Sequence, residues 1–143
     1  MSVRALTLES AQNPSWPWRQ LARCCVGMAR LLTRLPPRRL RRFLELARHG
    51  SRPATVTEAL RARSAVVATS VPCAGPRCLQ RSVATVLLCR LHGAWPDWCT
   101  GVRTRPFQAH AWVAVGGVPV GENLDEVRFF HVLMTVPTKG VRR

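Results

Sequence analysis

We expect the chain to fold around one helix, which is written Gly75-Pro76-Arg77-Cys78-Leu79-Gln80-Arg81-Ser82-Val83-Ala84-Thr85-Val86-Leu87-Leu88-Cys89-Arg90-Leu91. Apolar residues surround nearly the whole circumference from residue 77 to 91, which is typical of a helix buried on most sides. One stripe is different, because its small residues fall within about 60° of each other at 100° per residue. A sheet could approach closely along this stripe, which consists of Cys78, Ser82, Thr85 and Cys89.

Three residue types in this part of the chain suit nucleophilic cysteine catalysis. Proline is favoured in a first helical turn, so Pro76 places Cys78 where free backbone N–H groups and the helix dipole stabilise a thiolate. His110 opens an alternating segment that predicts a strand, and Glu122 follows the Gly116-Gly117 turn. A thiol, an imidazole and a carboxylate are the three parts that this chemistry requires.

The register of the hairpin decides which residue would orient His110. A two-residue turn pairs Val115 with Val118 and makes His110 face Asn123, whereas a three-residue turn brings Glu122 diagonal to His110 on the same face. A carboxylate stabilises an imidazolium better than an amide does, so Glu122 is the first candidate and Asn123 the second.

Other histidines and cysteines fit structural roles better. His49 and His92 each precede a glycine at a predicted helix end, and His131 is expected in a core or cross-strand position. A four-cysteine zinc site is disfavoured, because Cys78 and Cys89 would lie roughly 16 Å apart along one helix. With no glycine-rich phosphate loop either, we expect no metal and no nucleotide cofactor.

The elements on both sides of this helix predict an α+β fold. Amphipathic helices are expected over residues 19–35, 38–48 and 57–68, the last capped by Thr55 or Thr57, after an arm over residues 1–18. Their arginine-rich outer faces predict either a solvated layer or a surface for docking a peptide or a membrane. A tryptophan-rich loop over 94–98 and strands over 100–104, 110–115, 118–123 and 128–136 predict an antiparallel meander.

Length and charge narrow the class of protein. The 143 residues suit one compact domain, with an arm and basic helical region over 1–63 and a catalytic core over 64–143. The chain lacks an apolar run long enough to span a membrane and an apolar signal core, so a cytoplasmic protein with reduced thiols is expected. The net charge of +15 favours an anionic partner, and a basic nucleic-acid-binding module is one alternative. However, the aromatic residues do not interleave with the arginines as a stacking platform would, so we expect no nucleic acid.

Four segments resemble the protease component of lasso-peptide biosynthesis, over roughly residues 64–137. They are Cys73-Ala74-Gly75-Pro76-Arg77-Cys78-Leu79-Gln80-Arg81-Ser82, Leu87-Leu88-Cys89-Arg90-Leu91, Gly101-Val102-Arg103 and Pro106-Phe107-Gln108-Ala109-His110-Ala111-Trp112-Val113. That family has a transglutaminase-like, papain-related fold with a Cys-His-Asp type triad. The resemblance implies that Cys78 is the nucleophile, that His110 is the base and that the carboxylate position falls on Glu122. Here the chain departs from the commonly expected Asp, and it has Ala114 where an acidic residue often follows.

The resemblance also implies a substrate and partners. Such a cysteine peptidase removes the leader from a ribosomally made precursor peptide, so that an asparagine-synthetase-like cyclase can close the macrolactam ring. A small winged-helix domain usually presents the leader, and since this chain has no room for it, a separate recognition protein is implied as a partner. A transglutaminase-like acyl transfer is the further alternative, because an amine could intercept the same acyl-enzyme.

Overall fold

The structure is a computed structural model, and it describes residues 16–69 and 77–138. The Cys73 to Pro76 part of the predicted motif therefore lies outside the described residues, as does most of the predicted N-terminal arm. In chain order the elements are α2 (Trp16–Leu32), α3 (Pro37–Ala47), β1 (Arg52–Pro53), α4 (Val56–Thr69), α6 (Cys78–Leu91), β2 (Ala94–Trp95), β3 (Asp97–Thr104), β4 (Phe107–Val115), β5 (Val118–Pro119), α7 (Leu124–Val127) and β6 (His131–Val136).

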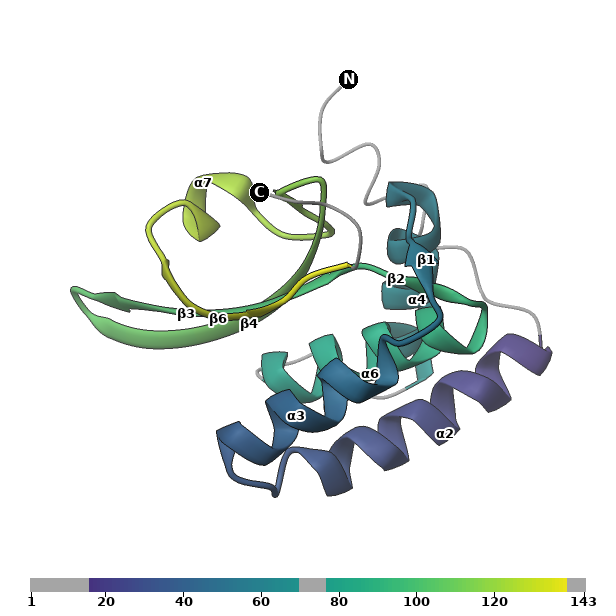
Figure 1. Cartoon of the computed structure of the whole chain (residues 1–143). Coiled ribbons are helices and arrows are strands. Elements are labelled where there is room, and N and C mark those ends of the chain that lie inside the picture. Colours follow the sequence, from purple (N-terminus) through teal and green to yellow (C-terminus); the bar gives the residue numbers. More distant parts are fainter. Residues whose placement is uncertain (1–15, 70–76, 139–143) are drawn as a thin grey trace.

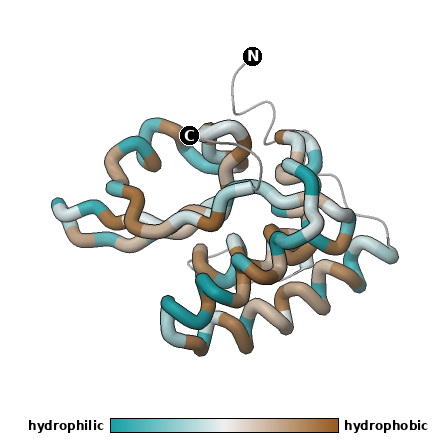
Figure 2. Tube along the Cα trace, viewed as in Figure 1, coloured by the Kyte–Doolittle hydropathy of each residue, from teal (hydrophilic) through white to brown (hydrophobic). Residues whose placement is uncertain are grey.

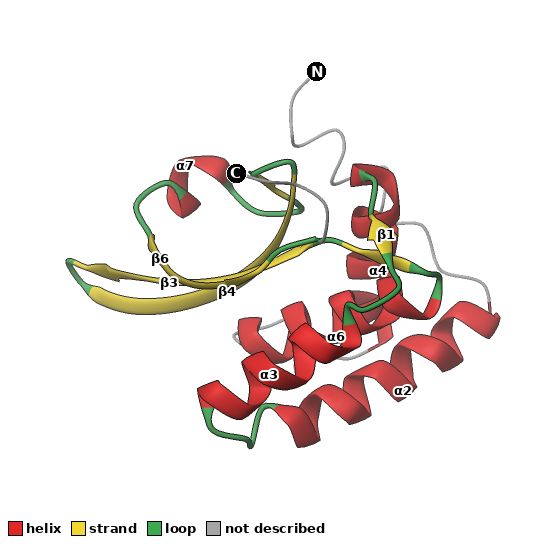
Figure 3. Cartoon of the chain, in the orientation of Figure 1, coloured by secondary structure: helices red, strands yellow, loops and turns green. Residues whose placement is uncertain are grey.

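A four-stranded antiparallel sheet lies between two unequal helical layers. Its strand order is β5-β4-β3-β6, with a layer of longer helices on one face and the short α7 on the other (Figures 1 and 3). The prediction of an α+β fold is therefore confirmed. The prediction of a simple meander is wrong, because β6 pairs with β3 at the far edge instead of following β5. A separate parallel pair joins β1 to β2.

The main core lies between the helical layer and the sheet. Helix α6 packs against α2, α4 and β4, and buried apolar residues of these elements form the core. Figure 2 shows the hydropathy of each residue along the chain. Trp98 of β3 is fully buried, and its indole N–H donates to the Ser82 hydroxyl at 3.1 Å. Cys78 interacts with β4 and Ser82 with β3, so the prediction that the stripe faces the sheet is confirmed for this part of α6. Cys89 is buried instead near Cys25 of α2 and Glu58 of α4.

The helices before α6 follow the expected pattern, with one exception at the start. Thr55 and Glu58 form a reciprocal capping box at the N-terminus of α4, with bonds of 3.1 and 3.2 Å, which confirms Thr55 as the cap. The expectation of an arm up to residue 18 is wrong for its last residues, because α2 begins at Trp16. Trp18 stacks on His92 at 4.4 Å between ring centroids, so a tertiary contact extends the helix backwards.

Other boundaries also differ from the sequence predictions. Strand β4 begins at Phe107, so His110 lies inside the strand instead of opening it. The tryptophan-rich loop expected over 94–98 instead forms β2 and the start of β3, because Trp95 and Trp98 are buried in the core. The strand expected over 118–123 stops at Pro119, and the one expected over 128–136 begins only at His131. Helix α7 lies in the chain between these two strands.

None of the described helices is long and apolar enough to cross a membrane.

Candidate active site

The structure brings Cys78, His110 and Glu122 together from three separate elements. Cys78 is the first residue of α6, His110 lies in β4, and Glu122 follows β5. The His110 ring hydrogen-bonds to the Cys78 side chain, and its Nε2 lies 3.1 Å from Oε2 of Glu122. Since Nε2 faces the carboxylate, Nδ1 is the ring nitrogen left for the sulfur.

Strand β4 contributes a second group to the sulfur, because the backbone N–H of Ala111 also hydrogen-bonds to Cys78. The sheet explains why this N–H is available. The Val113 carbonyl accepts from Val120, so the backbone groups of alternate residues, Ala111 among them, point to the same side of β4. Strand β5 pairs only with Ala114 and Val115 on that side, which leaves the neighbouring part of the edge open to α6.

The route by which Glu122 reaches His110 differs from both predicted registers. Val115 pairs with Val118, which is the two-residue turn that was expected to make His110 face Asn123. The strand ends too early for that pairing, and Gly121 turns the chain with a φ of +69°. The Asn123 side chain instead accepts from the Asp125 N–H and caps α7, while Glu122 contacts the imidazole.

Aromatic side chains flank the His110 ring. Trp112, two residues along β4, stacks near it at 5.8 Å between centroids, and Phe130 lies 5.5 Å away after α7. These ring contacts limit the rotation of the imidazole, and only 19% of the His110 side chain is exposed. The predicted same-face neighbour Trp112 is confirmed, whereas the role of Phe130 was missed, because the sequence predicted a strand there.

The electrostatics of the site favour a thiolate beside an imidazolium. Burial is the largest influence on Cys78 and raises its pKa, but the His110 and Ala111 hydrogen bonds and the charges of His110 and Arg81 together lower the pKa below the ordinary thiol value. Hydrogen bonds to Cys78 and then to Glu122 raise the pKa of His110 to about 9, against a smaller opposing effect of burial. The lowered pKa of Cys78 and the raised pKa of His110 both favour the thiolate–imidazolium pair.

Two arginines that the sequence prediction did not include lie on the other side of the carboxylate. Oε1 of Glu122 is 3.9 Å from Arg63 of α4 and 3.8 Å from Arg81 of α6. Only 11% of the Glu122 side chain is exposed, so three cationic groups share a largely buried carboxylate. Arg81 lies three residues after Cys78 on the same helix, which is a spacing that could have indicated its proximity.

The remaining histidines and cysteines lie elsewhere. His49 and His92 each place Nδ1 3.0 Å from a carbonyl of the preceding turn, as expected for helix ends. His131 pairs with Val102 across strands β6 and β3, which confirms the cross-strand position, while its exposure excludes the core alternative. Burial raises the pKa of Cys25 to about 11 and that of Cys89 to about 12. Among the described residues, no three His, Cys, Asp or Glu side chains gather into a group that could hold a metal ion.

Comparison with known proteins gives one match. The model of the transglutaminase-like superfamily matches residues 22–135, a span that includes all three site residues and the helical layer. Neither the curated proteins nor the solved structures contain a match to this chain. The fold of this superfamily is typical of cysteine proteases and acyl transferases. Because the match covers well over half of the chain, this protein belongs to the transglutaminase-like superfamily.

Proposed function

We propose that this protein is a cysteine peptidase that removes the leader peptide from a ribosomally made lasso-peptide precursor. The observation that carries the proposal is the hydrogen-bonded series Cys78, His110 and Glu122 inside a transglutaminase-like domain. The sequence motifs around Cys78 and His110 resemble those of the lasso-peptide protease component and supply the substrate class.

In the first half of the reaction, the Cys78 thiolate attacks the carbonyl carbon of the bond between leader and core. A carbon–sulfur bond forms, and the electron pair of the carbonyl moves onto its oxygen. The backbone N–H of Cys78 at the start of α6 is the natural donor to that oxyanion. As the intermediate collapses, the His110 imidazolium gives its proton to the departing core-peptide nitrogen, and the carbon–nitrogen bond breaks.

In the second half, water hydrolyses the thioester that joins the leader to Cys78. Neutral His110 takes a proton from the water as its oxygen attacks the acyl carbon. The carbon–sulfur bond then breaks, which releases the leader carboxylate and restores the thiolate beside the imidazolium. Glu122 keeps the ring oriented and stabilises its positive charge in both halves.

The proposed partners follow from the same assignment. The precursor leader would be presented by a separate small recognition protein, and the released core would pass to an asparagine-synthetase-like cyclase. The arginine-rich outer faces of α2 and α3 are the candidate docking surface, since Arg23, Arg30, Arg38 and Arg42 are all exposed. Cys24, Cys25, Cys78 and Cys89 carry free thiols, which fits the reducing cytoplasm in which we place the reaction.

Acyl transfer is the second candidate, because the superfamily fold serves both reactions and an amine could replace water in the second half. The product distinguishes the two reactions by mass. Hydrolysis leaves a free carboxylate on the leader, whereas transfer leaves an amide that carries the mass of the acceptor.

The test is to incubate the protein with a lasso precursor and its recognition protein, and to analyse the products by mass spectrometry. We expect a free leader acid and a core peptide with a new N-terminus. Cys78→Ala should release neither, whereas Cys24→Ala should cleave like the native protein, since Cys24 is an exposed thiol on α2 outside the site. Leader release by Cys78→Ala at the native rate would refute the proposal.

A further inference from the structure

Arg63 touches the segment that carries Glu122 at two points. Its terminal nitrogen lies 3.9 Å from Oε1 of the carboxylate, which is ion-pair range but longer than a hydrogen bond. The side chain is 19% exposed and belongs to α4, an element that contributes no other group to the catalytic series. The opposite carboxylate oxygen, Oε2, is the one that faces His110.

The second point of contact is Gly121, the residue before Glu122. A Cβ built on Gly121 would lie 2.6 Å from Cδ of Arg63 and 2.8 Å from its Nε. These distances are so short that the arginine side chain must lie directly against the Gly121 backbone. Gly121 also has a φ of +69°, a conformation that other residues rarely adopt, so the turn and the arginine fit each other only with glycine there.

We infer that Arg63 is a positioning residue, which holds the Gly121–Glu122 segment and one carboxylate oxygen so that the other oxygen meets His110. A glutamate on a short turn would otherwise sample several rotamers, and ordering it has an entropic cost. The arginine side chain both packs against the Gly121 backbone and attracts the carboxylate, which a lysine would do less well. Arg81 reaches the same carboxylate oxygen from α6. The inference rests on the proposed function only in assigning a catalytic purpose to the series.

If Arg63 positions Glu122, its removal should change the pKa of His110 in the opposite direction from the change expected if Arg63 acts only as a positive charge. Among the described residues, Cys78 and Glu122 interact with this ring directly, and Arg63 and Arg81 lie against the Glu122 carboxylate. Arg103 lies over the neighbouring ring of Phe130. If Arg63 acted only as a nearby positive charge, its removal would relieve repulsion and raise the pKa of His110. If Arg63 holds Glu122 in place, its removal weakens the His110–Glu122 bond and lowers the pKa of His110.

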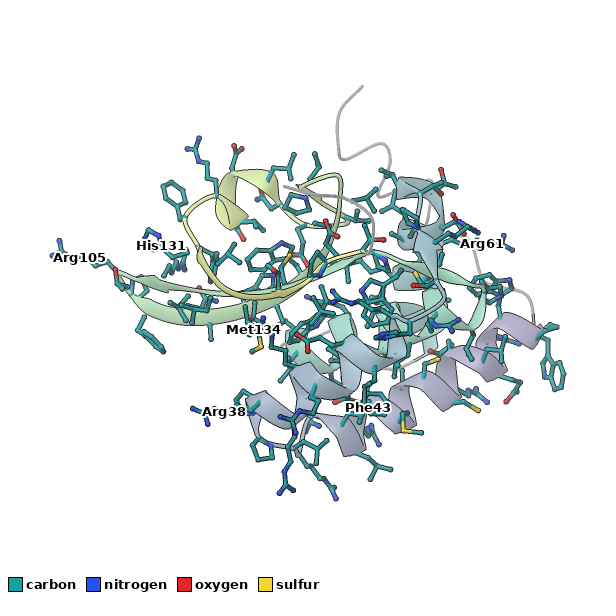
Figure 4. The ribbon with its side chains drawn as sticks, in the orientation of Figure 1. Arg38, Phe43, Arg61, Arg105, His131 and Met134 are labelled. Carbon is teal, nitrogen blue, oxygen red and sulfur yellow. The ribbon has the colours of Figure 1, made fainter. Side chains whose placement is uncertain are left out.

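The experiment measures the pKa of His110 in the full chain by NMR of nitrogen-15-labelled imidazole rings, assigned with a His110→Gln variant. In Arg63→Gln we expect the pKa of His110 to fall by on the order of one pH unit. Arg63→Lys keeps the positive charge, and the pKa of His110 in this variant should lie between the values in Arg63→Gln and in the native protein. Arg61→Gln is the matched control and should leave the value unchanged, because Arg61 of the same helix lies on the outer side of α4, where it stacks on Trp18 (Figure 4). An unchanged or raised pKa in Arg63→Gln would overturn the inference.

A second variant keeps the test decisive if Arg63→Gln does not fold. Gly121→Ala leaves the arginine present but drives a methyl group into it, so it should lower the pKa of His110 in the same direction. An unchanged pKa in a folded Gly121→Ala protein would also count against the inference. Neither measurement needs a substrate, so a native protein that cleaves no precursor would end the proposed function while leaving the positioning role to be judged by the titration alone.

Discussion

Replacing His110 with glutamine should remove the imidazolium that stabilises the Cys78 thiolate. Only the Ala111 hydrogen bond and the Arg81 charge would then oppose the effect of burial, and the pKa of the thiol would rise toward its reference value of 9.0. At pH 6, a thiol with that reference pKa is only about 0.1% ionised, so the thiolate fraction falls by up to about 1000-fold. The higher-pKa thiolate is also more nucleophilic, with a Brønsted coefficient of about 0.4–0.5, so its greater nucleophilicity offsets part of this fall. The net expectation is a lower alkylation rate at Cys78, by a factor smaller than that upper limit.

The assay is alkylation with iodoacetamide at pH 6, followed by peptide mapping with mass spectrometry. Exposed Cys24 is the internal reference, and Cys25 and Cys89 should stay unlabelled because burial raises their pKa values. The matched control is His131→Gln, which changes an exposed histidine on β6. If native protein and His110→Gln gave the same ratio of Cys78 to Cys24 labelling, the thiolate–imidazolium pair would not exist in solution.

Four further outcomes are expected. The kcat/KM of leader cleavage should rise with ionisation of the thiol and fall near pH 9, where the His110 imidazolium loses the proton needed by the departing amine; a plateau beyond pH 10 would contradict this order. Glu122→Gln should move that alkaline fall downward by on the order of one pH unit, measured in the same rate profile, because an opposite charge is lost. Ser82→Ala should leave the indole N–H of Trp98 without its buried partner and destabilise the protein by about 1–3 kcal/mol in urea unfolding; an unchanged midpoint would show that the bond is dispensable. Thr55→Ala should cost about 1 kcal/mol in the same assay, through loss of the capping box.

Local patterns predicted much of the architecture, because they depend on neighbouring residues alone. Residue spacing alone indicated the nearly all-apolar helix with its stripe of small residues and the helix cap at Thr55. It also indicated that His49 and His92 lie at the C-terminal ends of helices. The strand pairing across the sheet was not, since β6 joins β3 over a long separation that no local signal encodes.

The candidate site was predictable in its residue types but not in its geometry. The sequence motifs around Cys78 and His110 were enough to single out these two residues. The position of Glu122 depends instead on where β5 ends and on the positive φ at Gly121. Arg63 could not have been found from the sequence, because α4 reaches the carboxylate only through tertiary packing.

The Cys78 sulfur and the His110 imidazole belong to different layers, one at the tip of α6 and the other on the sheet. Mild warming or dilute denaturant that loosens the packing between these layers would separate the Cys78 sulfur from the His110 ring while the helices and strands remain intact. The chemistry should therefore disappear earlier than the far-ultraviolet signal, and the labelling rate of one cysteine would report how firmly the two halves of the molecule are joined.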